Sequence, residues 1–368
     1  MNNCYIDQVL HLLHVFNDQG YKAYIVGGAV RDFLLEKDCS DIDIVTTASP
    51  EQISTLFNKS FQMNTEHQTV IVHYDQLQLE VTTMRGDSIE EDLRKRDLTI
   101  NSMAMDVSRD IIDPFGGQAD LKQRLLRSLQ PDQRFEEDPL RMLRVIRFVS
   151  ELGYNVEQAS KQVIAQKASM LRSVAPERLS KEWLKLLKGH YVKFAIDLLL
   201  DTKLYKDIPI LQLTSNELEK LRSILLENQM SDVLIWTTFC LVYSPPKSQF
   251  LINMAVPTAI RRQVKTRLDW FKMRVNNTWN REMLFDATLE VALDVEYVRK
   301  KFQYTFINSD ELKEKWLELP IHSRSELAIT GHDLLKIGKK AGSWISSALR
   351  EAEIAVIKGT CKNEKMSY

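Results

Sequence analysis

At 368 residues the chain is longer than one hydrophobic core usually supports, so we expect two or more domains. Its apolar content of 44% excludes a mainly disordered chain, and its formal net charge of -1 excludes nucleic-acid binding through a generally basic surface. The four cysteines form no C-x-x-C pair, which argues against a zinc site and favours a reducing cytoplasm. No stretch of about 18 apolar residues occurs, so we expect no membrane partner.

The first 120 residues or so mix helical and extended patterns. Apolar positions at helical spacing predict a helix at 6–16, a helical turn at 30–35 and a further helix that begins at Ser49-Pro50. Short apolar or alternating runs predict strands at 24–26, 42–45, 70–73 and 77–82. The last two strands flank Tyr74-Asp75-Gln76, as in a hairpin.

From residue 135 onward the pattern is almost entirely helical. Amphipathic helices are predicted at 139–152, 158–171, 177–187 and 192–200. Turn or linker signals stand at 244–248 and 275–278. The sequence therefore predicts an α+β fold, with a mixed first part and an all-helical remainder.

A pair of carboxylates, Asp41 and Asp43, stands at the second predicted strand. Residues i and i+2 of a strand point to the same face, roughly 6 to 7 Å apart, so both side chains can converge on one site. Magnesium prefers oxygen ligands, and two such ions about 4 Å apart can activate an attacking hydroxyl and steady a leaving pyrophosphate. Taken alone, the pair is more typical of an exposed strand or turn than of a metal site.

The turn that precedes this pair favours a nucleotide-binding site over an exposed strand or turn. Gly27 and Gly28 follow a strand, where backbone N–H groups can approach a triphosphate, and Arg31 offers a forked donor for phosphate oxygens. Glu80 alternates with apolar neighbours in the strand at 77–82. We give equal weight to two roles for Glu80. It is either a third carboxylate beside the metal pair or a glutamate that faces solvent.

The segment 137–148 predicts a helix with acids in its first turn. Asp138, Arg141 and Arg144 then share one face. A salt-bridged surface helix is the simpler interpretation. A carboxylate and a guanidinium on adjacent turns are also suited to a base with an exocyclic amine, so the pair Asp138 and Arg141 would select CTP and ATP.

These segments occur in the order typical of one enzyme family. The chain resembles the bacterial class II CCA-adding tRNA nucleotidyltransferases over essentially its whole length. The motifs that carry the resemblance are Gly27 to Asp32, Asp41-Ile42-Asp43, Glu80 to Arg85, Lys95 to Asn101, Ile112 to Gly117, Glu137 to Phe148, Glu177-Arg178-Leu179 and Gly331 to Leu335.

The resemblance implies a role for each matched residue. Asp41 and Asp43 would hold two Mg²⁺ ions, and Gly28 and Arg31 would contact the triphosphate. Ribose recognition is implied for the motif that contains Arg96, Asp97 and Asn101. Asp138 and Arg141 would form a protein template for the base, supported by Glu137, Arg144 and Arg147.

The same resemblance implies a domain plan and a reaction. The plan is a nucleotidyltransferase head related to DNA polymerase β at 1–122, followed by an all-α neck at 123–195, body at 196–275 and tail at 276–368. The helical parts would bind the tRNA acceptor arm. The reaction is the addition of CMP from CTP, then AMP from ATP, to the tRNA 3′ end without a nucleic-acid template.

One departure from the family concerns the terminal adenosine. Members that complete CCA usually carry a flexible loop of some twenty further residues after the strand that ends near Arg85, whereas this chain passes through Gly86-Asp87-Ser88-Ile89 directly to Glu90. Such shortening resembles the CC-adding subgroup, in which a separate A-adding enzyme completes the end. The alternatives are an A-adding enzyme or poly(A) polymerase on the same scaffold and, more remotely, a non-catalytic RNA-binding protein.

A local basic run follows Pro257 and has two interpretations. It consists of Arg261, Arg262, Lys265, Arg267, Lys272 and Arg274. The residues fit either a solvated helix face or a contact with tRNA phosphates.

Overall fold

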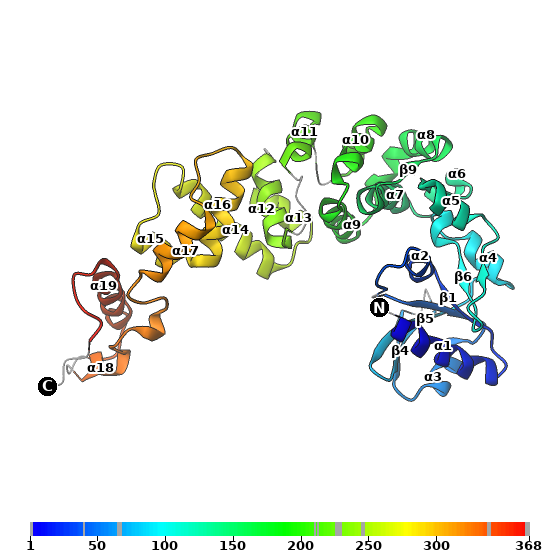
Figure 1. Cartoon of the computed structure of the whole chain (residues 1–368), viewed down its shortest axis with the longest axis horizontal. Helices are drawn as coiled ribbons and strands as arrows, with labels where there is room; N and C mark the ends of the chain where they lie inside the picture. Colours follow the sequence, from blue (N-terminus) through cyan, green and yellow to red (C-terminus); the bar gives the residue numbers. More distant parts are fainter. Residues whose placement is uncertain are drawn as a thin grey trace. The chain divides into compact units, whose positions relative to one another are not determined.

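The computed structural model describes residues 3–39, 41–64, 68–209, 211, 213–224, 230–243, 247–336 and 340–364. The chain forms two compact units, residues 1–228 and 229–368 (Figure 1). Of the linker signal at 244–248, residues 244–246 lie outside the described part. The division into head, neck, body and tail stays a prediction.

The first unit begins with a mixed sheet. In the described residues this sheet has seven strands in the order β3-β4-β5-β2-β1-β6-β7. Strands β2 and β5 run parallel, and the other neighbours are antiparallel. The strands are β1 Ala23–Val26, β2 Asp43–Thr46, β3 Ser60–Asn64, β4 Thr69–Tyr74, β5 Leu77–Thr83, β6 Ala104–Met105 and β7 Ile111–Ile112.

The two faces of the sheet have different cover. Helices α1 (Asn3–Asp18) and α3 (Pro50–Leu56) pack on one face (Figure 1), where Ile25, Ile44 and Val81 are fully buried. On the other face, α4 (Ile89–Arg94) covers only part of the sheet, through a cluster that includes Val26, Val45 and Leu93. A strip of sheet beside β2 and β5 is therefore left for polar side chains.

The predicted elements of this region are confirmed. Ser49 caps α3 in a capping box with Gln52, and β4 and β5 form the expected hairpin. The helical turn expected at 30–35 is α2 (Gly28–Leu34). The sequence missed β3, β6 and β7, and also the small parallel pair β8 (Leu125–Leu126) and β9 (Asn155–Val156).

The rest of the first unit is helical. Its elements are α5 Gly117–Gln123, α6 Pro131–Glu137, α7 Leu140–Leu152, α8 Gln158–Lys167, α9 Pro176–Lys188, α10 Val192–Thr202 and α11 Ser215–Ile224, with 3₁₀ turns η1 Thr99–Asn101, η2 Ala168–Ser173 and η3 Leu204–Asp207. Helix α7 packs against α9 and α10. Leu140, Leu143 and Ile146, at steps of three along α7, are buried there.

One helix start differs from the prediction. Glu137 is the last residue of α6, Asp138 is extended with φ -147° and ψ 96°, and α7 begins only at Leu140. The reason is Pro139, because a proline disfavours the helical conformation in the residue before it. Asp138 therefore lies in the link between two helices, and the predicted acids in the first turn of one continuous helix were wrong.

The second unit consists of helices around its own core. They are α12 Asp232–Val242, α13 Lys247–Asn253, α14 Thr258–Met273, α15 Arg281–Ala287, α16 Leu289–Lys301, α17 Ser309–Leu317, α18 Gly331–Leu335 and α19 Trp344–Lys358, with the 3₁₀ turn η4 Arg324–Glu326. Ala292, Val295 and Leu312 are among its buried residues. Among the described residues, every helix of the chain is too short or too polar to cross a bilayer.

The basic run after Pro257 divides between the interior and the surface. Arg267 is 3% exposed and pairs with Glu290 and Asp294, and Arg274 is buried beside Glu296. These two arginines are therefore part of the packed interior. The other residues of the run remain candidates for a solvated helix face or for contact with tRNA phosphates.

Glu296 holds several buried groups of the second unit together. Its carboxylate pairs with Arg274 at 2.8 Å, accepts a hydrogen bond from Trp279 Nε1 at 2.8 Å and accepts another from the Ile307 backbone. We predict that Glu296→Ala lowers the free energy of unfolding of this unit by about 3 kcal/mol, because it leaves buried charge without its partner. Urea unfolding measures this change.

The matched control is Glu314→Ala. Glu314 is exposed on α17, so the change should stay within about 0.5 kcal/mol. Equal unfolding midpoints for the two variants would contradict the prediction.

Candidate active site

Three carboxylates gather at the partly covered face of the sheet. Asp43 is the first residue of β2, with Asp41 two positions before it, and Glu80 on β5 is the register partner of Asp43. Partial desolvation by the surrounding protein raises the pKa of Asp43, opposed by Arg96 and reinforced by Asp41, although the side chain remains accessible to solvent. The pKa of Glu80 is also raised, by burial and then by Asp43 and Asp41. The structure thus places Glu80 beside the predicted pair.

The glycine turn lies between β1 and α2. Gly27 has φ 73° and ψ -130°, and its N–H donates to the Met103 carbonyl. A Cβ atom built on Gly27 would stand 2.7 Å from Nη1 of Arg96. Only glycine suits this position, because it accepts the positive φ and lets Arg96 approach the backbone. Gly28 then opens α2.

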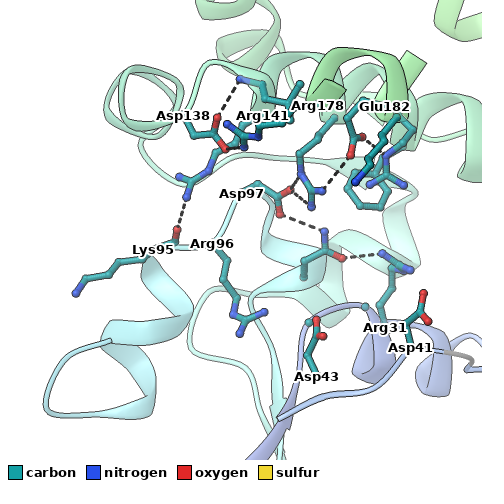
Figure 2. Close-up of a pocket in the computed structure, with 18 of the residues that line it drawn as sticks. Arg31, Asp41, Asp43, Lys95, Arg96, Asp97, Asp138, Arg141, Arg178 and Glu182 are labelled. Carbon is teal, nitrogen blue, oxygen red and sulfur yellow. Dashed lines mark hydrogen bonds and ion pairs between the residues drawn. The ribbon is translucent and has the colours of Figure 1, made fainter. Parts of the chain in front are cut away.

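A cavity of about 650 Å³ in the first unit brings most of the predicted residues together (Figure 2). The predicted residues that line it are Gly28, Arg31, Asp41, Asp43, Arg96, Asp97, Asn101, Asp138, Arg141, Arg144 and Arg147. Glu80 lines a neighbouring cavity instead. Glu137 is not among the lining residues and forms ion pairs with Arg134 and Arg141.

Asp97 is the centre of a hydrogen-bond network in this cavity. Its carboxylate accepts hydrogen bonds from Arg144 at 2.8 Å and from Asn101 at 3.2 Å. The Asn101 side chain in turn accepts from Arg31 at 2.8 Å, so the network reaches the glycine turn (Figure 2). Burial alone would raise the pKa of Asp97, but the attraction of Arg144 and these hydrogen bonds lower it to about 2.

Glu182 on α9 extends this network and was missed from the sequence. It pairs with Arg147 at 2.6 Å and with Arg144 at 3.5 Å, while being 7% exposed. Its spacing was the available signal: Glu182 lies three residues after Leu179 and four before Leu186, which are both buried. An acid in the apolar stripe of a helix indicates a buried cationic partner.

The two residues expected to read the base already have protein partners. Asp138 accepts a hydrogen bond from Arg178 at 2.8 Å, and Arg141 donates to the carbonyl of Lys95 at 3.0 Å (Figure 2). Both side chains still line the cavity. They face it from the link before α7 and from the first turn of α7, respectively.

A second cationic group adjoins the carboxylates. Arg85 and Arg96 both bond to Asp92, at 3.0 Å and 3.3 Å. Asp92 is fully buried, and although burial raises its pKa, the hydrogen bonds and charge of Arg85 with those of Arg96 lower it. Two guanidinium groups therefore share one carboxylate, which leaves one net positive charge beside Asp43.

The carboxylate pair fits a divalent cation. Magnesium is usually bound through one or two carboxylates together with substrate phosphates and water. Among the described residues, no group of three or more His, Cys, Asp or Glu side chains is placed to hold a metal ion, so substrate oxygens would complete the coordination. Cationic charge between Asp41 and Asp43 would also offset their mutual repulsion.

Paired carboxylates beside a glycine turn, on a mixed sheet followed by helices that line the same cavity, define a nucleotidyltransferase. The head-domain family model for poly(A) polymerase matches residues 23–127. A model described as the probable RNA- and SrmB-binding site of polymerase A matches 153–213, and one described as tRNA nucleotidyltransferase domain 2 (putative) matches 228–367.

Whole-chain relatives identify the family. A CC-adding tRNA nucleotidyltransferase of Halalkalibacterium halodurans is 39% identical, over 98% of this chain and 96% of the relative. Its counterpart in Shouchella clausii is 40% identical, over 96% and 94%. The crystal structure of the Bacillus stearothermophilus CCA-adding enzyme with CTP is 34% identical and superimposes with a TM-score of 0.87, covering 97% of this chain and 94% of that one.

The chain therefore belongs to the family of CC- and CCA-adding tRNA nucleotidyltransferases. The predicted resemblance, the enzymatic class and the polymerase β-like head followed by helices are confirmed. An A-adding enzyme, a poly(A) polymerase and a non-catalytic RNA-binding protein are not favoured by these relatives.

The lowered pKa of Asp97 gives a prediction about acid stability. The folded-state pKa of about 2 lies below the ordinary value of 3.8, so ionised Asp97 stabilises the fold above about pH 4. That contribution is lost as the pH falls from about 4 towards 2. A difference of nearly two pKa units corresponds to about 2 kcal/mol. Asp97→Asn should therefore lose stability at pH 7 and differ less from the unmodified protein near pH 2.

Urea unfolding at pH 7 and pH 2.5 measures both values. Asp110→Asn, at an exposed position in the same unit, is the control and should follow the unmodified protein at both pH values. A difference between Asp97→Asn and the unmodified protein that does not change with pH would count against the prediction.

Proposed function

We propose that this protein adds two CMP residues from CTP to the 3′ end of tRNA, releases pyrophosphate each time, and leaves the terminal A to a separate A-adding enzyme. The observation that carries the proposal is the short link between β5 and α4, residues 84–88. Two relatives at 39% and 40% identity are named CC-adding enzymes, which supports the same assignment.

Bonds within the link support a single conformation. Asp87 N–H donates to the Glu91 side chain at 3.2 Å, and the Ser88 hydroxyl caps α4. The Lys95 ammonium donates to the Arg85 carbonyl at 2.9 Å. A link tied at both ends has little freedom to rearrange around a second kind of base, so we expect the cavity to stay set for cytosine.

In this proposal, different residues of the cavity contact the triphosphate, the ribose and the base of the nucleotide. Gly28 and Arg31 contact the triphosphate, and Arg96, Asp97 and Asn101 surround the ribose. Asp138 accepts from the exocyclic amine of cytosine while Arg141 donates to its ring nitrogen or carbonyl oxygen. Glu137, Arg144 and Arg147 hold these groups in place through the contacts described above.

Two Mg²⁺ ions complete the site in this proposal, held by Asp41 and Asp43. When bound, magnesium activates the attacking hydroxyl and stabilises the leaving pyrophosphate. Glu80 supports the pair from β5. The tRNA partner contributes its acceptor arm, and the three cysteines that the structure describes as free are consistent with a reducing cytoplasm.

The test of the number of nucleotides added is direct. The protein is incubated with a tRNA that lacks CCA, together with CTP and ATP, and the product is sequenced. We expect products that end in CC in the presence of ATP. Products that end in CCA would show that the terminal A is also added, and incorporation from ATP alone onto the tRNA without CCA would overturn CMP transfer.

The metal assignment makes a second prediction. Asp41→Ala should lower CMP incorporation by at least about 10³-fold, because the proposed metal site loses one of its two ligands. Its affinity for tRNA should change less than about two-fold. Filter binding and incorporation assays measure the two effects, with Asp110→Ala as the control. An unaffected rate would refute the assignment of Asp41.

A further inference from the structure

A second cavity, of about 360 Å³, adjoins the carboxylates on the β5 side of the sheet. Asp43, Glu80, Thr69, Thr82, Arg85 and Arg96 are among the residues that line it. Asp43, Arg85 and Arg96 also line the nucleotide cavity, so the two cavities meet at Asp43. The roles assigned to the nucleotide cavity leave the second cavity without an occupant.

The geometry of phosphoryl transfer limits what this occupant can be. The attacking and leaving oxygens stand roughly in line on opposite sides of the phosphorus atom. In the sheet order, β1 leads into the glycine turn, β2 carries the aspartates and β5 lies beyond them. With the triphosphate at the glycine turn, as proposed above, the pyrophosphate leaves on that side and the attacking hydroxyl approaches from the β5 side.

The side chains of the second cavity suit a ribonucleotide. The hydroxyl oxygens of Thr69 and Thr82 lie 3.0 Å apart on neighbouring strands. Thr82 is two residues after Glu80, so both point to the face that carries Asp43. A threonine hydroxyl can both donate and accept, as a ribose hydroxyl does. Arg85 and Arg96, which share Asp92, provide a net positive charge for the preceding phosphate.

We propose that this cavity binds the terminal nucleotide of the tRNA acceptor end, and that Thr82, held by Thr69, contacts the 2′ hydroxyl of its ribose. The inference rests on the proposed function, since it concerns the second substrate of the same reaction. The 2′ hydroxyl is the group that distinguishes RNA from DNA at such a site. Thr82 is thus a positioning residue that orients the 3′ end beside the carboxylates.

The test is a double-mutant cycle, in which one protein hydroxyl and one RNA hydroxyl are removed separately and together. Thr82→Val and the unmodified protein are compared on a tRNA without CCA and on the same tRNA with a single 2′-deoxy nucleotide at its 3′ end. We expect a loss in kcat/KM of about 5- to 10-fold from either change alone, in line with one lost hydrogen bond. The two changes together should cost little more than one of them.

Three companion measurements keep the result specific. Thr82→Ser keeps the hydroxyl and should retain discrimination against the deoxy end. The KM for CTP and the preference for CTP over 2′-deoxy-CTP should not change in Thr82→Val, because the incoming ribose belongs to the other cavity. Thr55→Val, at an exposed position on α3, should behave as the unmodified protein on both tRNAs.

Several outcomes separate failure of this inference from failure of the proposed function. Independent, multiplying losses from the two changes would overturn the contact between Thr82 and the 2′ hydroxyl, and so would an effect confined to the KM for CTP. If the unmodified protein transfers no CMP to the normal tRNA, the proposed function itself fails.

Discussion

The buried charge of Asp97 is the constraint on which the nucleotide site depends. A carboxylate in a protein interior is stable only when it is paired and hydrogen-bonded. Arg144 and Asn101 meet this requirement, and each connects Asp97 to a different part of the unit. Through Asn101 the network reaches Arg31 and the glycine turn, and through Arg144 it reaches Glu182 on α9. Groups that line the cavity thus also connect the helices to the sheet.

This pairing also shapes the electrostatics of the cavity. Arg31, Arg96 and Arg144 each have an acidic partner in Asp32, Asp92 and Asp97, respectively. The lining nevertheless carries nine Lys and Arg side chains against six Asp and Glu side chains, so a triphosphate would meet directed hydrogen-bond donors together with an excess of positive charge. The exposed carboxylate pair lies within this cationic lining, where a divalent cation bound together with substrate phosphates would offset its negative charge.

The sequence was sufficient where local pattern and chemistry coincide. The Asp41 and Asp43 pair, the capped helix at Ser49 and the hairpin around Asp75 follow from spacing and turn residues. The two-residue strands β6 to β9 could not be predicted, because a two-residue alternation cannot be distinguished from a loop. Asp138 was misplaced because helical spacing continues across Pro139, although the backbone does not. The partners of Glu182 lie on another helix, and only tertiary packing brings them together.

The register between β2 and β5 has a consequence for how such an enzyme can vary. Side chains alternate between the faces of a strand, so a shift of one residue would turn Glu80 towards the core and Val81 towards the substrate. Insertions or deletions within these strands would therefore abolish the site. The link at 84–88 begins just after β5 ends, and its length can change without moving any residue of the sheet. Under the CC-adding proposal, a change of chain length at this point would alter the range of products while the reaction centre stays the same.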